Sequence, residues 1–319
     1  MKAIVQHRYG PPDVLRLEEV EKPVPGDGQV LVRVRAASII VADWHMMRGS
    51  PFFVRLIGGL RRPKNPVPGT DVAGEVEAVG ANVKQLRPGD AVFGWCTGAF
   101  AEYACAGEDH FVPKPAALTF EQASTVPEGG RTALQGLRDH GRVAPGQKVL
   151  IIGASGGVGT FAVQIAKALG AEVTGVCSAR NAELVRSIGA DHVIDYARED
   201  VTRGENRYDV ILQLAGTASP SALRRALTPA GTLVLSSGQG RFAGIDRIVK
   251  ALVSSPFVRQ RQAVFVTKAN QADLLALNEL LESGAVTPVI DRTYPLNETP
   301  AAVRYVEAGH TRGRVVITL

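Results

Sequence analysis

The stretch Lys148–Leu169, KVLIIGASGGVGTFAVQIAKAL, decides the fold of this 319-residue chain. A run of aliphatic residues leads into a glycine-rich turn at 153–159, which is followed by apolar residues at three- and four-residue spacing. This order predicts a strand, a tight turn and an amphipathic helix that ends at Gly170. Glycines let the backbone of such a turn approach a phosphate, to which the helix N-terminus offers N–H groups. The stretch therefore predicts a nucleotide-binding site, with a turn that binds no ligand as the alternative.

Downstream of this stretch, strand patterns alternate with helical patterns. Strands are expected at 172–177, 192–196, 209–214, 231–237 and 263–268, and a helix at 181–188. Such alternation predicts a parallel, doubly wound sheet that binds ligands at the carboxyl ends of its strands. The glycine turn lies where a dinucleotide would bind in that architecture.

Upstream of the central strand the pattern has a period of two. It recurs around 3–5, 30–34, 72–79 and 91–93, which predicts a small all-β domain. A short helix on a loop is expected at 50–57, and Thr119 with Gln122 predicts a capping box. The last residues are extended at 287–294 and 313–319 around a helix at 299–308, so they suit the first domain. We therefore expect a β domain at 1–117, a nucleotide domain at 118–285 and a return to the β domain at 286–319.

Composition limits the class of protein. Hydrophobic residues make up 45% and charged residues 21% of the chain, as is ordinary for a globular protein. The net charge is +5, and the positive residues are scattered apart from one tight group, Arg61, Arg62 and Lys64. Neither a nucleic-acid surface nor a membrane-spanning helix is expected. The three cysteines lie far apart and predict no disulfide framework. A cytoplasmic location is therefore expected.

Several motifs carry a resemblance to a known family. They are GTDVAG at 69–74, RPGD at 87–90, GAFAEY at 98–103 and GRVV at 313–316, together with the glycine turn. With these motifs the whole chain resembles the medium-chain dehydrogenase/reductase superfamily, and most of all its zinc-free, zeta-crystallin-like quinone oxidoreductase branch. The resemblance implies an α/β protein with a GroES-like β domain and a Rossmann domain. It also implies an enzyme that transfers hydride from NADPH to a quinone or an α,β-unsaturated carbonyl, and a homodimer paired through the strand at 263–267.

The resemblance also allows a test for a metal. The alcohol dehydrogenase branch holds catalytic zinc with two cysteines and a histidine, and the matching positions here are Ile40, Thr70 and Glu128. One carboxylate cannot form a catalytic zinc site, which normally has three protein ligands, so no metal is expected. The Asn-Pro pair common in the zinc-free branch is replaced by Ile40 and Val41. Glu128 is expected to form an ion pair with Arg131, with a catalytic acid as the alternative.

The expected substrate side centres on Asp43, Trp44 and His45. Negative charge that develops on the substrate oxygen needs a hydrogen-bond donor, and His45 matches a family position that holds a tyrosine or a proton-relay histidine. A purely structural histidine is the alternative, and Asp43 is expected to orient rather than to act as an acid. The predicted pocket residues are Ile40, Trp44, Phe52, Phe53, Glu128 and Phe242. The apolar pattern at 242–252 fits core packing, a dimer contact or a substrate lid.

The expected cofactor is NADPH rather than NADH. NAD-specific sites have a carboxylate at the end of the second strand, where this chain reads Cys177-Ser178-Ala179-Arg180-Asn181. Arg180 can form charge-assisted bonds to a 2′-phosphate. The predicted cofactor-binding residues are Thr132, Gly153, Ser155, Gly156, Gly157, Val158, Gly159, Ser178, Arg180, Asn181, Tyr196, Ala215, Ser237, Gly238, Phe265 and Arg314. A nucleotide-binding protein without turnover and a biosynthetic reductase with a reshaped pocket stay open as alternatives.

Overall fold

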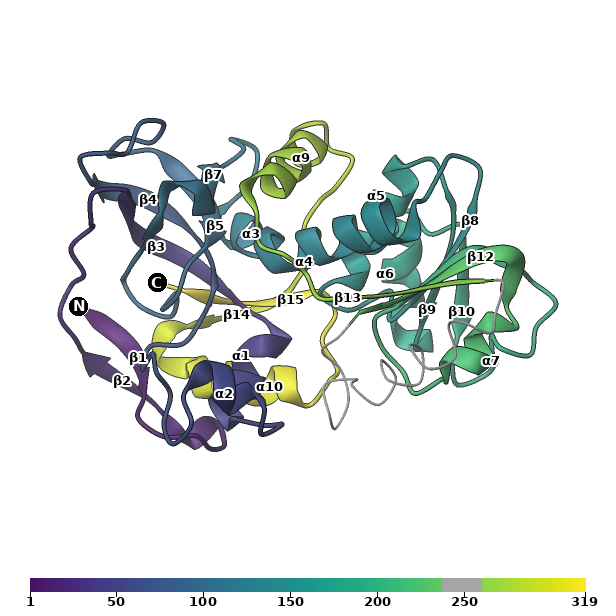
Figure 1. The fold of residues 1–319 in the computed structure, drawn as a ribbon, viewed down its shortest axis with the longest axis horizontal. Helices are drawn as coiled ribbons and strands as arrows, with labels where there is room; N and C mark the ends of the chain where they lie inside the picture. Colours follow the sequence, from purple (N-terminus) through teal and green to yellow (C-terminus); the bar gives the residue numbers. More distant parts are fainter. Residues whose placement is uncertain (237–259) are drawn as a thin grey trace. The chain divides into compact units, whose positions relative to one another are not determined.

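The computed structural model describes residues 1–236 and 260–319 (Figure 1). The chain forms two compact units. The first unit comprises Met1–Glu128, Ala269–Glu282 and Pro288–Leu319, and the second comprises Gly129–Lys268 and Ser283–Thr287. Helix α9 (Gln271–Glu282) belongs to the first unit, where it packs on strand β7 (Phe111–Pro113), and the domain boundaries expected at 117 and 285 stay predictions. The amide of Gln271 fixes this contact by donating to the carbonyl of Phe111 at 2.9 Å.

The second unit contains a parallel sheet of the predicted kind. Its strand order within the described residues is β10-β9-β8-β11-β12-β13, and each neighbouring pair is parallel. The strands are β8 (Lys148–Ile152), β9 (Glu172–Cys177), β10 (His192–Asp195), β11 (Tyr208–Gln213), β12 (Leu227–Ser236) and β13 (Arg261–Phe265). The order reverses between β8 and β11, which is the switch point where such sheets bind ligands. The doubly wound sheet is confirmed.

Helices of the second unit connect and flank these strands. They are α4 (Val126–Leu134), which begins in the first unit, η3 (Gln135–Gly141), α5 (Gly159–Ala168), η4 (Ala179–Asn181), α6 (Ala182–Ser187) and α7 (Pro220–Arg224). The chain that follows α4 forms a π-helix over Gln135–Gly141, a geometry that is frequent at functional sites. Strand β12 begins earlier than expected, because its pairing with β11 shifts register around Pro229 and Gly231. A shift of this kind lets a proline stay within a strand.

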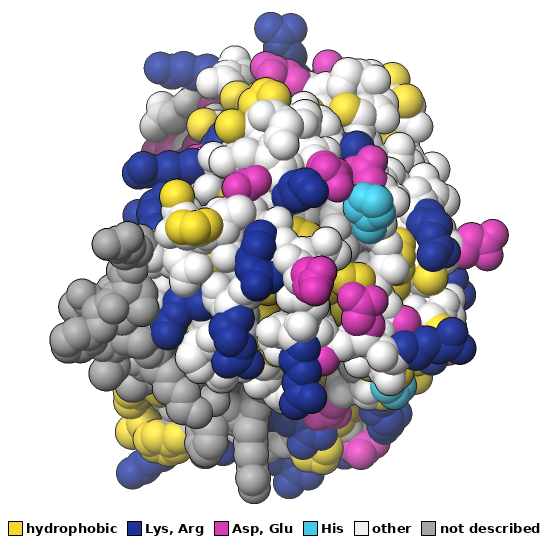
Figure 2. Space-filling model, turned by 90° about the vertical axis from the view of Figure 1, so that its right-hand side faces the viewer, with side chains coloured by type: hydrophobic (Ala, Val, Ile, Leu, Met, Phe, Trp, Pro, Cys, Tyr) yellow, Lys and Arg dark blue, Asp and Glu magenta, His cyan; other side chains and the backbone are white. Residues whose placement is uncertain are grey.

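The surface carries both signs of charge. On the face shown in Figure 2, Lys and Arg side chains are interspersed with Asp and Glu, and hydrophobic side chains appear singly or in small groups. This mixture agrees with the scattered charge of the sequence. None of the described helices is long and apolar enough to cross a membrane.

The first unit is built on two sheets whose strand pairs are antiparallel, except that β14 and β15 are parallel. Strand β1 (Lys2–Gln6) pairs with β2 (Leu15–Glu19), and a second sheet has the order β14-β15-β3-β4-β5-β7, with β6 (Tyr103–Gly107) also paired to β3. The remaining strands are β3 (Gln29–Ile39), β4 (Asp71–Val79), β5 (Ala91–Trp95), β14 (Ile290–Pro295) and β15 (Arg314–Thr318). Strand β15 is antiparallel to β3, with Val316 opposite Ser38. The C-terminal segment therefore lies in the first unit.

Short helices complete the first unit. They are η1 (Pro12–Val14), α1 (Val41–Arg48), α2 (Val54–Gly58), η2 (Glu108–His110), α3 (Phe120–Ser124), η6 (Leu296–Glu298) and α10 (Thr299–Glu307). The predicted capping box at α3 is present: the Gln122 N–H donates to Thr119 Oγ1 at 3.2 Å, and the Thr119 N–H donates to Gln122 Oε1 at 3.0 Å.

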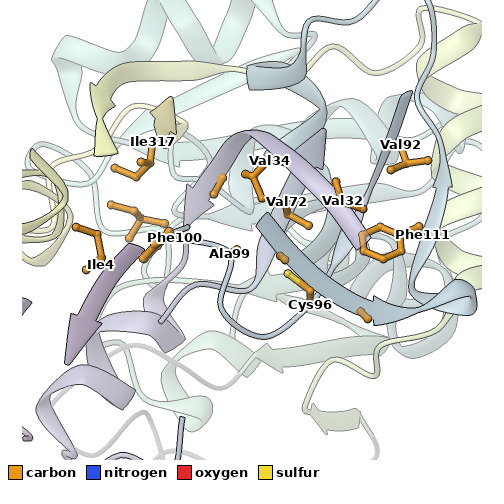
Figure 3. Close-up of a cluster of buried hydrophobic side chains, with 14 of the residues drawn as sticks. Ile4, Val32, Val34, Val72, Val92, Cys96, Ala99, Phe100, Phe111 and Ile317 are labelled. Atoms are coloured by element: carbon orange, nitrogen blue, oxygen red, sulfur yellow. The ribbon is translucent and has the colours of Figure 1, made fainter. Parts of the chain in front are cut away.

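The core of the first unit follows from strand alternation. Val30, Val32 and Val34 of β3 are buried, whereas Arg33 between them is exposed. Figure 3 shows Val32 and Val34 in one cluster with Phe100 and Phe111, side chains that come from separate segments. Full burial of a valine stabilises by about 1.5–3 kcal/mol, so this face of β3 fixes the strand in the sheet. Side chains at the end of β3 and its neighbours are thereby held in place.

Candidate functional site

The glycine turn after β8 requires glycine at specific positions. Gly153 has a φ of 91°, and a Cβ there would lie 2.7 Å from the Cβ of Ala215. A Cβ on Gly159 would lie 2.0 Å from the carbonyl oxygen of Gly153. Both contacts are closer than real Cβ atoms approach. A Cβ on Gly156, in contrast, would meet only the Gly153 oxygen at 3.5 Å. The turn therefore has no room for a side chain at Gly153 or Gly159. It is open at Gly156, where a Cβ would make an ordinary contact.

Helix α5 starts directly from this turn. Its N-cap is Val158, whose side chain cannot accept a hydrogen bond, so no side chain caps the first turn. The N–H groups of a first helical turn and the positive end of the helix dipole attract anions. An open turn above an uncapped helix N-terminus fits the pyrophosphate of a dinucleotide, and Gly153, Gly156, Gly157, Val158 and Gly159 would hold it.

Asn181 and Ser155 support the turn from the end of β9. The Asn181 amide donates to Ser155 Oγ at 2.9 Å, and only 4% of Asn181 is exposed. Its Oδ1 has no hydrogen-bond partner within residues 1–236 and 260–319. This contact assigns Asn181 a bracing role. A contact of Asn181 with a 2′-phosphate stays a prediction.

The ends of β9 and β10 lie side by side in the sheet. Asp195 of β10 lies opposite Cys177 of β9, and the Tyr196 N–H donates to the Cys177 carbonyl at 3.2 Å. Arg180 and Tyr196 are exposed, and Ser178 is half-buried. The pairing of β10 with β9 also places the carboxylate of Asp195 at these strand ends, and Asp195 is not among the predicted cofactor residues. Asp195 faces Arg198, which lies 3.6 Å away, so part of its charge is balanced.

Side chains from α4 and η3 fix the segment that follows β13. Thr132 Oγ1 lies 2.6 Å from Thr267 Oγ1, and Gln135 exchanges two hydrogen bonds with the backbone of Lys268. Phe265 is buried and stacks on His140, with ring centroids 4.6 Å apart. Thr132, a predicted cofactor residue, is therefore hydrogen-bonded to the segment that follows Phe265 at the end of β13. Gln135 was missed, although a glutamine in an otherwise apolar helical stretch was a signal.

Three predicted residues fall in the part of the chain without a described structure. Ser237 and Gly238, predicted for the cofactor, and Phe242, predicted for the pocket, lie outside the described residues, as does the whole 242–252 pattern. Their roles stay predictions.

In the first unit, Asp43 occupies the first turn of α1. Its carboxylate accepts the N–H of Ile40 at 2.8 Å, which caps the helix, and only 6% of the residue is exposed. Burial raises the pKa of Asp43 to about 8; the Ile40 N–H opposes this shift, and the charges of Asp71 and Glu128 add to it. The capping bond fixes the start of α1, and the orienting role expected for Asp43 stays a prediction.

An ion pair between half-buried Glu128 and buried Arg314 links Glu128 to the last strand. Arg314 of β15 is 5% exposed, and its guanidinium donates to the Glu128 carboxylate. The Glu128 N–H donates in turn to Asp71 Oδ2 at 2.9 Å, and Asp71 is 1% exposed. Arg314 was predicted for the cofactor, and the structure engages it with Glu128 within the first unit. The expected pair between Glu128 and Arg131 stays a prediction.

Two further polar atoms lie near this part of the sheet. Ser38 is opposite Asp71 in the pairing of β3 with β4, and its Oγ is buried without a partner in the described part of the chain. Arg314 Nε is likewise buried without a hydrogen-bond partner among the described residues. Asp71 and Ser38 were not predicted, although an ionisable residue at the start of a buried strand was a signal in GTDVAG.

His45 lies one turn after Ile40 on α1. Its Nδ1 lies 2.8 Å from the carbonyl oxygen of Ser50, so Nδ1 carries the proton and Nε2 holds the lone pair of the neutral ring. Trp44 stacks on this ring at a centroid distance of 3.7 Å. Ile40 is buried beside them, whereas Phe52 and Phe53 are exposed. His45 is thus held in one tautomer.

The described residues around His45 and Glu128 do not form a metal-binding site. Within the described residues no group of three or more His, Cys, Asp or Glu side chains is placed to hold an ion. At the positions compared above, Ile40 is apolar and Glu128 is bound to Arg314. Cys96 is buried as a free thiol, and burial raises its pKa far above the usual value.

Comparison with known proteins agrees with this architecture. Residues 26–116 match the alcohol dehydrogenase GroES-like domain, and residues 188–317 match the zinc-binding dehydrogenase family. A chloroplastic quinone oxidoreductase of Triphysaria versicolor is 32% identical, over 99% of this chain and 98% of its own length. The chain belongs to the medium-chain dehydrogenase/reductase superfamily. Within the superfamily it falls in the quinone oxidoreductase branch, which confirms the resemblance drawn from its motifs.

Two other members of this superfamily add detail. A chloroplastic NADPH-dependent alkenal/one oxidoreductase of Arabidopsis thaliana is 32% identical, over 99% of this chain and 79% of its own length. The Escherichia coli quinone oxidoreductase, solved in complex with NADPH, has a TM-score of 0.84 and 26% identity, with full coverage of both chains. The two curated relatives carry chloroplastic names, so the cytoplasmic location expected for this chain stays a prediction.

Proposed function

We propose that this protein is an NADPH-dependent, metal-free oxidoreductase that reduces a quinone or the carbon–carbon double bond of an α,β-unsaturated carbonyl. The observation that carries the proposal is the glycine turn at the switch point of the sheet, open at Gly156 above the uncapped N-terminus of α5. The names of the relatives, quinone oxidoreductase and alkenal/one oxidoreductase, support the same reaction class.

The preference for NADPH over NADH rests on the end of β9. Cys177 and Ser178 stand where an NAD-specific site has a carboxylate, and Arg180 is exposed next to them. Tyr196 lies beside Cys177 through its backbone bond. Asp195 is an opposing charge at these two strand ends, and its partner Arg198 reduces its effect. A 2′-phosphate would therefore meet a cation at this edge.

The chemistry follows from the residues of the first unit. Bound NADPH supplies a hydride from nicotinamide C4. The electron pair displaced from the substrate then collects on its oxygen, which needs a donor or a proton. His45 carries a lone pair on Nε2 in its neutral form, so it donates to this oxygen only after taking up a proton there. Asp43 fixes the start of the helix that bears His45.

A metal-free mechanism is proposed because the Glu128 carboxylate already forms an ion pair with Arg314. This carboxylate is therefore not available to a metal, and the side chains of Ile40 and Thr70 offer no strong metal ligand beside it.

A homodimer is proposed from β13, an edge strand in the described sheet whose following residue, Val266, is 70% exposed. A monomer in light scattering at micromolar concentration would contradict the dimer.

The decisive experiment is NADPH oxidation against a panel of quinones and enones. Binding of NADPH without oxidation by any acceptor would favour a nucleotide-binding protein without turnover. This alternative is kept because Ile40 and Val41 replace the Asn-Pro pair of the branch. A chelator-treated sample with undiminished turnover would support the metal-free mechanism.

A further inference from the structure

The segment that contains α2 combines exposed apolar residues with positive charge. Between residues 44 and 70 the sequence contains no aspartate or glutamate, but it contains Arg48, Arg55, Arg61, Arg62 and Lys64. Arg48 is bound to Glu307 and is therefore neutralised. Arg61, Arg62 and Lys64 take part in none of the ion pairs that the described residues form. The segment thus has a local excess of positive charge.

Large apolar side chains are exposed on the same segment. Ile57 is 77% exposed, Leu56 69%, Phe52 63% and Leu60 58%. Six of the eleven large hydrophobic residues exposed in the described chain lie between residues 46 and 60: Met46, Phe52, Phe53, Leu56, Ile57 and Leu60. Single exposed hydrophobic residues are normal, but a concentration of this kind marks a binding surface.

Contacts with the body of the first unit hold this segment in shape. The Tyr9 hydroxyl donates to the Gly59 carbonyl at 2.5 Å, and Arg55 Nε donates to the Gly49 carbonyl at 2.9 Å. The Arg55 guanidinium also lies over the Tyr9 ring, 4.8 Å from its centroid. Val54 is buried, so α2 is anchored on one side while Leu56 and Ile57 stay exposed. Helix α2 packs on α1, as Figure 1 shows.

We propose that residues 52–64 attach the protein to the surface of a membrane that contains anionic lipids. Leu56, Ile57 and Leu60 would enter the boundary between headgroups and acyl chains. Arg61, Arg62 and Lys64 would face the negative headgroups. Apolar side chains flanked by basic residues form the usual pattern of interfacial binding, and the absence of acidic residues gives the charge complementarity. No membrane-spanning helix is needed for such attachment.

Flotation with lipid vesicles tests this proposal and requires no enzymatic activity. Vesicles of phosphatidylcholine alone are compared with vesicles that also contain phosphatidylserine at about a third of the lipid, a strongly anionic composition. We expect the protein to float with the anionic vesicles only, and high salt to release most of it because salt screens the charges. Equal binding to neutral vesicles, or binding to neither kind, would overturn the proposal.

Matched variants separate the apolar and basic contributions. Leu56→Ser with Ile57→Ser, and separately Arg61→Gln, Arg62→Gln and Lys64→Gln, should each reduce the floated fraction at least about fivefold, since each set removes one of the two binding forces. The controls are Leu17→Ser with Val24→Ser, and Arg16→Gln, Lys84→Gln and Arg87→Gln, which change exposed residues elsewhere in the first unit. The controls should bind like the wild type.

Three measurements keep the outcome unambiguous. Thermal unfolding shows that each variant is folded. If the segment variants instead break up a self-associated form seen in sedimentation, the patch covers a second copy and the proposal is wrong. Binding to polyglutamate without binding to anionic vesicles would likewise overturn it in favour of an acidic protein partner.

Discussion

Arg314 and Glu128, which lie 186 positions apart in the sequence, form an ion pair that ties the last strand to helix α4. Glu128 is 30% exposed, so water partly solvates the carboxylate that removal of Arg314 leaves behind, and loss of a hydrogen bond to a charged group costs about 1.5–3 kcal/mol. We expect Arg314→Met to lower the free energy of unfolding by about that amount in urea titrations. Arg35→Met, which breaks the exposed pair with Glu75, should cost at most about 1 kcal/mol.

A double variant extends the same test. Glu128→Gln with Arg314→Met removes both charges, so it should be more stable than Arg314→Met alone. A double variant as unstable as the single one would show that packing of the arginine side chain, rather than the pair, carries the effect.

Asp43 should make stability depend on pH. Its pKa is about 8 in the folded protein and about 3.9 in an unfolded chain, so the folded state binds more protons in between. Stability contributed by this group is therefore present at low pH and is lost as pH rises from about 4 to about 8. Asp43→Asn keeps an acceptor for the Ile40 N–H but cannot ionise.

The measurement is the free energy of unfolding of Asp43→Asn relative to the wild type between pH 5 and pH 9. The relative stability of the variant should increase with pH and level off near pH 8. A difference that is constant over this range would show that Asp43 does not titrate there.

Two glycines of the turn should respond differently to alanine. Gly159→Ala places a Cβ 2.0 Å from the Gly153 oxygen, so it should destabilise the second unit. Gly156→Ala makes only an ordinary contact of 3.5 Å with the Gly153 oxygen, so it should keep the melting temperature of the wild type but weaken NADPH binding at least about tenfold, because the methyl group occupies the place of the phosphates. Calorimetry and fluorescence titration measure the two effects. Unchanged binding in Gly156→Ala would contradict a cofactor above this turn.

Arg180 should discriminate between the two cofactors. A hydrogen bond to a charged group is worth about 1.5–3 kcal/mol, so Arg180→Ala should weaken NADPH binding about tenfold to a hundredfold. NADH binding should hardly change. Arg203→Ala, an exposed arginine elsewhere in the second unit, is the control. An equal loss for both cofactors, or a wild type that prefers NADH, would show that no phosphate pocket exists.

His45 should assist the reaction through Nε2. His45→Ala should lower kcat about tenfold to a thousandfold, with NADPH affinity nearly unchanged. His45→Asn places an amide N–H near the position of Nδ1, so it can keep the bond to Ser50 but lacks Nε2. A catalytic histidine is supported if both variants are slow. Full activity in His45→Asn would mean that the role of His45 is structural.

The elements that the sequence predicted are those with local causes. The glycine turn, the alternation of strands and helices and the Thr119 capping box each depend on residues close together in the chain. The site in the first unit depends on distant ones. Glu128 meets Asp71 and Arg314 only because β15 pairs with β3 and β3 pairs with β4. The spacing along the sequence favours Arg131 as the partner of Glu128, and it carries no information about how β15, β3 and β4 pair.

Side-chain register explains the other differences. Asp195 was overlooked because only the pairing of β10 with β9 places it opposite Cys177. The bracing role of Asn181 depends on its contact with Ser155, 26 positions away. Helix α9 was assigned to the nucleotide domain because it continues the chain after β13, whereas its packing on β7 is a tertiary contact.

The most direct test of the central claim is NADPH consumption by the purified, chelator-treated protein with a quinone and with an enone. The account predicts that NADPH is oxidised in a one-to-one ratio with the acceptor reduced, and that the rate with NADPH exceeds the rate with NADH. Tight binding of NADPH with no oxidation in the presence of any acceptor, or turnover that returns only when zinc is added, would contradict it.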